Sequence, residues 1–161
     1  MPFRRIFYPD LIVPVAGGVG SHLYWRINVT ATDSADSFKA QITEMEYRAT
    51  VGGADQATGG TATASSNYST TPPADAFDDS VTTSWVSDNG AALPQWLRYQ
   101  FASAVEVAQI SITSGDNAAR AARAPKDFTI QFSDDGSSWT TALSVTGEPA
   151  WGITETRLYT I

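Results

Sequence analysis

The chain has 161 residues with 17 acidic and 10 basic side chains, a net charge of −7, no cysteine and a single histidine. This length suits one well-packed domain, and the negative charge without a basic cluster argues against a nucleic acid as partner. The absence of cysteine excludes disulfides, cysteine nucleophiles and thiolate zinc sites.

Residues 1–20 are expected to form an N-terminal arm, because prolines interrupt their apolar run and the segment ends in the glycine-rich stretch 16–20. The interrupted run does not favour a signal peptide, and no segment reaches the roughly 20 apolar residues needed to cross a membrane. Apolar side chains on such an extension favour a protein partner. The candidate partner-binding residues are Phe3, Phe7, Tyr8, Leu11 and Ile12.

The first strand signal follows the arm. Trp25, Ile27 and Val29 alternate with polar residues, the period of a strand with one buried face. Residues 42–49 predict a second strand. The segment 51–66 is rich in glycine, alanine, threonine and serine, and is interpreted as a linker or a strand laid on the surface.

Short strand patterns dominate the rest of the chain. The best helical candidate, 118–124, is short and ends at Pro125. Many short strands without long helices predict an all-β, antiparallel jelly-roll sandwich. The strands are expected at 96–101, 105–113, 128–133, 140–145 and 156–161.

Four motifs follow one another along residues 60–161. They are Ala62-Thr63-Ala64-Ser65-Ser66, Ala76-Phe77-Asp78-Asp79 with Thr83 and Trp85, Gln95 through Phe101, and Lys126-Asp127-Phe128 through Trp139. In this order they resemble the discoidin, or coagulation-factor type C, family. The resemblance implies a galactose-binding-like jelly roll, a fold shared by many carbohydrate-binding modules.

Residues 24–27 and 42–47 resemble the closing strands of that family, although here they come first. Either the domain is circularly permuted within one chain, or these strands complete a neighbouring copy by exchange. We expect one sandwich over 21–161, with displaced strands at 21–50 and the main body at 67–161. A homo-oligomer is also expected.

The resemblance implies a structural calcium ion at the acidic loop. Carried over residue by residue, Asp78, Ser80 and Thr83 would supply oxygen ligands, and Glu44 would add a carboxylate from the displaced strand. Asp79 departs from the glycine usual in the family. The alternative is that Asp78 and Ser80 only accept hydrogen bonds from turn amides.

The insertion 114–125 is the candidate ligand loop, because long loops of sandwiches commonly bind ligands. The polar residues of this loop would form directional hydrogen bonds with a hydroxylated ligand. The alternative is that the loop is only a solvated, alanine-rich turn. The polar residues are Arg120, Arg123, Asp116 and Asn117. Tyr68 and the turn at 88–89 are further loop candidates.

Aromatic stacking on a sugar is assigned to Trp151, the tryptophan least explained by a strand. Trp25, Trp85, Trp96 and Trp139 are expected to pack in or against the core.

Catalysis is not expected, since the adjacent acids at 78–79 and 134–135 are explained by turns and no nucleophile elbow, phosphate loop or zinc signature occurs. The layout is similar to modules of bacteriophage tail and virion proteins. That resemblance implies a non-catalytic virion component, produced in the host cytoplasm, which recognises surface carbohydrate as a receptor-binding, tail-fibre or decoration protein. The alternative is a structural virion protein that contacts other virion proteins through its arm and binds no sugar.

Overall fold

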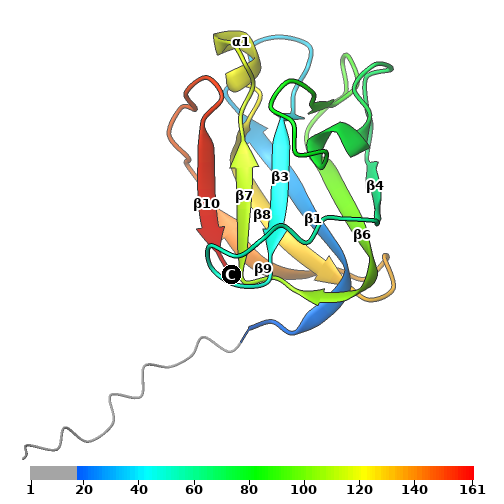
Figure 1. Cartoon of the computed structure of the whole chain (residues 1–161). Coiled ribbons are helices and arrows are strands. Elements are labelled where there is room, and N and C mark those ends of the chain that lie inside the picture. Colours follow the sequence, from blue (N-terminus) through cyan, green and yellow to red (C-terminus); the bar gives the residue numbers. More distant parts are fainter. Residues whose placement is uncertain (1–17) are drawn as a thin grey trace, which may run out of the picture.

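The computed structural model describes residues 18–161, which form ten β-strands, one short α-helix and one 3₁₀ turn (Figure 1). The elements are β1 (Ser21–Thr32), β2 (Gln41–Ile42), β3 (Glu44–Arg48), β4 (Thr61–Ala64), η1 (Pro73–Ala76), β5 (Trp85–Val86), β6 (Gln95–Glu106), β7 (Gln109–Thr113), α1 (Ala118–Ala121), β8 (Pro125–Ser133), β9 (Thr140–Val145) and β10 (Thr156–Thr160).

The strands form antiparallel sheets that stack as a sandwich. A five-stranded sheet has the order β4-β6-β1-β8-β9, a three-stranded sheet the order β10-β7-β3, and β2 pairs with β5. The three-stranded sheet lies in front of the five-stranded sheet in Figure 1. The predicted all-β antiparallel sandwich is confirmed.

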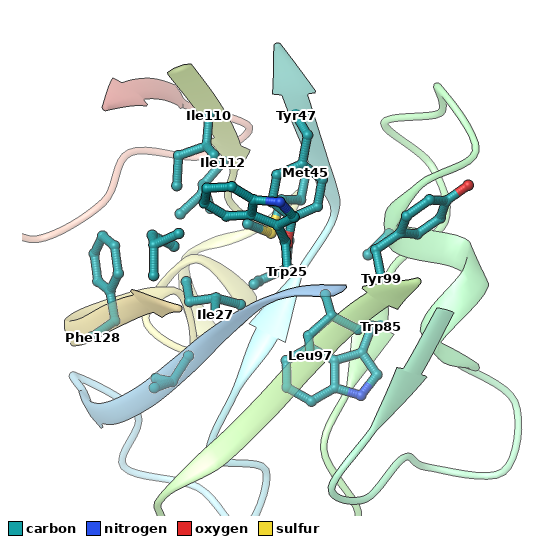
Figure 2. Close-up of a cluster of buried hydrophobic side chains, with 14 of the residues drawn as sticks. Trp25, Ile27, Met45, Tyr47, Trp85, Leu97, Tyr99, Ile110, Ile112 and Phe128 are labelled. Carbon is teal, nitrogen blue, oxygen red and sulfur yellow. The ribbon is translucent and has the colours of Figure 1, made fainter. Parts of the chain in front are cut away.

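Side-chain alternation places the core between the two main sheets. Trp25, Ile27 and Val29 all point from β1 into the core, as their spacing predicts, and none of them is exposed. Each such side chain contributes roughly 1.5–3 kcal/mol of burial free energy. Figure 2 shows Trp25 and Ile27 in one cluster with side chains of the opposite sheet, among them Met45, Tyr47, Ile110 and Ile112.

The N-terminal strands pack on the body of the same chain. β1 lies between β6 and β8, and β3 pairs with β7. The start of β1 and the C-terminal residue also lie near each other. Ser21 lies opposite Glu106, and the Ile161 amide donates to the Ala108 carbonyl at 2.9 Å. The start of β1 and the C-terminal residue therefore both lie beside the turn that joins β6 to β7.

Three local expectations need adjustment. The stretch 105–113 is not one strand, because β6 ends at Glu106 and β7 begins at Gln109 in the other sheet. The helix at 118–124 shortens to α1. Within 51–66, residues 61–64 form the surface strand β4, which pairs with β6 at the edge of the larger sheet.

Candidate functional site

A pocket of about 420 Å³ opens at the α1 end of the sandwich. Loops from distant parts of the sequence lie at this end (Figure 1). The loops are those before β2, around η1, before β5 and at α1. The residues that give the pocket its chemistry are Phe38, Gln41, Tyr68, Asp75, Thr82, Thr83, Ser84, Arg120 and Arg123.

Two aromatic rings and one guanidinium form a rigid wall. The rings of Phe38 and Tyr68 meet edge to face with centroids 5.2 Å apart, and the Arg123 guanidinium lies 4.7 Å from the Phe38 centroid. Arg123 donates to the Asp36 carboxylate at 2.7 and 3.0 Å and to the Gln41 amide oxygen at 3.2 Å. Arg123 therefore orients the Phe38 ring, and Tyr68 is 39% exposed.

Arg120 lies at the rim and is held from behind. Its guanidinium donates to both Asp116 carboxylate oxygens, at 2.8 and 3.0 Å, and half of its side chain is exposed. Asn117 caps α1 by accepting from the Arg120 amide at 3.1 Å. Arg120 and Arg123 thus line the pocket, whereas Asp116 and Asn117 support Arg120 and are not among the lining residues.

Trp151 does not present an exposed face, so its assignment as a stacking platform is wrong. Only 9% of the residue is exposed, its indole N–H donates to the Pro125 carbonyl at 2.8 Å, and the Arg157 guanidinium covers its ring at 4.1 Å. The absence of a strand pattern around Trp151 gave a misleading signal, because a loop residue can still close the core.

Among the other tryptophans, Trp25 and Trp85 are fully buried as expected. Trp96 and Trp139 are only partly buried. Trp139 packs back on the sheet against Arg26, with the guanidinium 4.0 Å from the ring centroid.

The four predicted metal ligands come together next to the pocket. The Thr83 hydroxyl donates to the Asp78 carboxylate at 2.8 and 3.0 Å, and the Ser80 amide donates to Asp78 at 3.1 Å and to Glu44 at 3.2 Å. Thr83 also lines the pocket, so the acidic loop and the pocket share a wall. The Ser80 turn amide is satisfied here, as the alternative reading requires, and its hydrogen bonds link Asp78 of the loop to Glu44 of β3.

Glu44 is a buried carboxylic acid whose neighbours Asp78 and Asp79 are also acidic. Burial and the neighbouring charges of Asp78 and Asp79 together raise its pKa to about 7, although hydrogen bonds from the Ser80 and Met45 amides act in the opposite direction. None of the ion pairs among residues 18–161 involves Glu44 or Asp78. A buried carboxylate without a basic partner is costly, which a cation would relieve.

The donor set fits a calcium ion better than a transition metal, because every candidate ligand atom is a carboxylate or hydroxyl oxygen. Residues 18–161 contain no group of three or more His, Cys, Asp or Glu side chains placed for a metal, so backbone carbonyls would have to complete the shell. Asp79 has φ of +59°, the left-handed conformation that glycine adopts easily. Asp79 therefore has a backbone conformation that glycine, the usual residue of the family at this position, adopts easily.

Sequence reasoning missed several pocket residues, among them Phe38, Gln41 and Asp75. An isolated phenylalanine within the polar stretch 33–39 was the available signal for Phe38. Burial, followed by the charge of Asp78, raises the pKa of Asp75. The predicted partner residues of the arm, Phe3, Phe7, Tyr8, Leu11 and Ile12, lie outside the described residues.

The fold and the site define an antiparallel β-sandwich domain with a polar and aromatic pocket between its end loops. The family model of the F5/8 type C domain matches residues 61–157, more than half of the chain, and the chain belongs to this family. Domains of the family are generally non-catalytic binding modules.

The family match begins at β4, so that β1 and β3 lie outside it although both belong to the two main sheets of the structure. No curated protein matches the chain, and no solved structure matches it. Among residues 18–161 there is no helix long and apolar enough to cross a membrane.

Proposed function

We propose that the chain is a non-catalytic module that binds surface carbohydrate in the α1-end pocket. The observation behind this proposal is the combination, in one pocket of about 420 Å³, of aromatic rings, guanidiniums, a carboxylate and hydroxyls. Sites for small hydroxylated ligands have this volume and this mixture of apolar surface with a few directional polar groups. Tyr68 offers an exposed ring, and Arg120 and Asp75 offer a donor and an acceptor for sugar hydroxyls.

A calcium ion held by Glu44, Asp78, Ser80 and Thr83 is part of the proposal. The ion would join β3 to the loop before β5 and neutralise the buried acid. Because Thr83 belongs to both the acidic loop and the pocket wall, the ion would also fix one side of the pocket. Chelation is therefore expected to weaken sugar binding as well as the fold.

We further place this module in a bacteriophage virion, as a receptor-binding, tail-fibre or decoration component. The support is the similarity in layout described above, in which two closing strands precede the family core. The target would then be a glycan of the host cell surface.

A glycan array probed in the presence of calcium tests the binding function. The wild-type chain should select a small set of glycans, and Tyr68→Ala and Arg120→Ala should each lose them. Lys126→Ala, which removes an exposed ion pair with Asp33 away from the pocket, should keep them. An array without any signal, or pocket variants that bind like wild type, would overturn the proposal.

The second candidate is an assembly protein without sugar binding, favoured by the apolar residues of the arm at positions 3, 7, 8, 11 and 12. Truncation of residues 1–20 separates the candidates. Loss of incorporation into particles together with a silent glycan array would support assembly. Retained incorporation with a positive array would support the binding module.

A further inference from the structure

Two arginines lie directly opposite each other in the five-stranded sheet. Arg26 of β1 is the cross-strand partner of Arg98 of β6, and like charges in this arrangement destabilise a sheet. Burial, and then the charge of Arg98, lowers the pKa of Arg26. The sheet therefore carries a repulsive pair at its centre.

Neither guanidinium is neutralised by an acid. The other four arginines of residues 18–161 each form an ion pair with a carboxylate, but Arg26 and Arg98 occur in none of the seven ion pairs of this region. This is unexpected in a chain with net charge −7. Two uncompensated positive charges on an acidic protein point to an anionic ligand.

Aromatic rings flank both guanidiniums. Arg26 lies 4.0 Å from the centroid of Trp139, and Arg98 lies 5.5 Å from Tyr24 and 5.6 Å from Trp96. All five side chains are partly exposed. We call this set the arginine-aromatic face.

The guanidiniums are also oriented by neutral acceptors. Arg26 donates through Nε to the Gln131 amide oxygen at 2.7 Å, and Arg98 donates through Nε to the Thr63 hydroxyl at 2.9 Å. Arg98 makes one further long contact, of 3.5 Å, to the Gly136 carbonyl. The remaining N–H groups of both side chains are left for a ligand, and the held geometry lowers the entropy cost of binding.

We propose that the arginine-aromatic face binds a carboxylate-bearing polysaccharide, a chain of acidic pyranose units. A guanidinium recognises a carboxylate through two parallel hydrogen bonds, and the aromatic rings offer surfaces for the apolar faces of pyranoses. The face crosses adjacent strands about 4.8 Å apart, a spacing comparable with the length of one sugar unit. A linear chain laid across the strands can therefore meet both arginines in turn.

An acidic peptide fits this face less well. Peptides bind sheets by adding a strand at an edge or a helix in a groove, whereas β1 and β6 each have neighbours on both sides. No residue of the arginine-aromatic face lines the α1-end pocket. This second site is therefore independent of the proposed pocket function.

The test compares binding of three polymers, polygalacturonate, neutral dextran and polyglutamate, to the whole chain at a fixed moderate salt concentration. Wild type should bind polygalacturonate more tightly than either of the others. The double variant Arg26→Gln/Arg98→Gln should lose at least about tenfold in affinity. Lys126→Gln, which removes one positive charge outside both proposed sites, should bind polygalacturonate like wild type.

The melting temperature of the double variant should not fall, because the substitution relieves repulsion between the arginines. A melting temperature equal to that of wild type or higher would show that the variant folds. No binding of polygalacturonate by wild type, equal binding of polyglutamate, or unchanged affinity in the double variant would each overturn the proposal. Loss in the pocket variant Arg120→Gln instead would assign the polymer to the pocket. If the pocket variants Tyr68→Ala and Arg120→Ala lose their glycans on the array but the double variant does not, the pocket and the arginine-aromatic face are separate sites.

Discussion

Glu44 is the residue whose environment departs most from an ordinary surface acid. Only 6% of it is exposed, its neighbours Asp78 and Asp79 are acids, and its pKa is raised to about 7. The native state therefore holds a proton on Glu44 between pH 4.5 and 7 that the unfolded state has released. Without a bound cation, this group makes the native state less stable as pH rises through that window.

Replacement of Glu44 by glutamine should raise the free energy of unfolding in chelator at pH 8, by on the order of 2 kcal/mol, and should have little effect at pH 4. Urea unfolding at both pH values measures this difference. Glu46→Gln makes the same chemical change two residues along β3, where Glu46 pairs with Arg48, and should not stabilise. An equal effect of Glu44→Gln at both pH values would contradict the assigned pKa.

Calcium should reverse this behaviour, because the ion requires the deprotonated carboxylate. We expect calcium to raise the melting temperature more at pH 8 than at pH 5, and to have no effect on Glu44→Gln. A melting temperature that calcium leaves unchanged at pH 8 would remove the proposed metal site.

Trp151 offers a second test at the scale of one residue. Trp151→Phe keeps an aromatic ring, although a smaller one, and removes the N–H that donates to the Pro125 carbonyl. Unfolding should become easier by about 1–2 kcal/mol, since a buried carbonyl loses its partner. The array pattern of glycans should stay the same, and a selective loss of sugar binding with unchanged stability would restore Trp151 as a ligand residue.

At the scale of elements, β4 depends on a close approach that only glycine allows. A Cβ at Gly60 would lie 2.3 Å from the backbone oxygen of Gln100 and 2.5 Å from the Tyr99 ring. The Gly60 amide also donates to the Tyr99 hydroxyl at 2.8 Å. The edge strand can therefore pair with β6 only if residue 60 has no side chain.

Gly60→Ala should cost about 1–3 kcal/mol, as overpacking against a backbone does. Chemical denaturation of the variant measures it. Gly152→Ala is the control, because its Cβ would meet only the flexible Glu155 carboxylate, at 3.3 Å. Equal stability of the two variants would contradict the close packing of β4 on β6.

Elements with a clear period could be predicted from the sequence, and those without one could not. Alternation over Trp25, Ile27 and Val29 gave both the strand and its buried face. The corner at Val107 could not be read, because the residues on both sides are strand-like and nothing local marks the change of sheet. Phe38 stands alone in a polar stretch, but its role in the pocket was missed because that role arises only when four distant loops meet.

The candidate site was predicted unevenly for a physical reason. Arg120 and Arg123 were found because a long polar insertion stands out in a sandwich sequence. The contact of Glu44 with the loop of Asp78 came from the family resemblance, since no local pattern links residues 34 positions apart. Trp151 was misjudged because burial of a loop residue depends on tertiary packing.

At the scale of the whole molecule, the chain order differs from the order of packing. β1 fills the position between β6 and β8, and yet it precedes the segment that the family model matches. The Ile161 amide donates to the Ala108 carbonyl, and Ser21 lies opposite Glu106. The C-terminal residue and the start of β1 are therefore close enough for a short linker to join them.

A permuted chain tests this arrangement. Residues 53–161, followed by a short Gly-Ser linker and residues 18–50, should fold cooperatively with a melting temperature within a few degrees of the parent. The new ends fall at the exposed turn beside Val51. The fragment 53–161 alone should stay unfolded because it lacks the central strand β1. A folded fragment or an unfolded permutant, judged by circular dichroism, would contradict the arrangement.

A crystal structure of the chain grown with calcium and the glycan that the array selects would locate the bound sugar. We expect a sugar ring against Tyr68, with its hydroxyls bonded to Arg120 and Asp75. A glycan bound elsewhere, with the α1-end pocket left open, would contradict the proposed binding function.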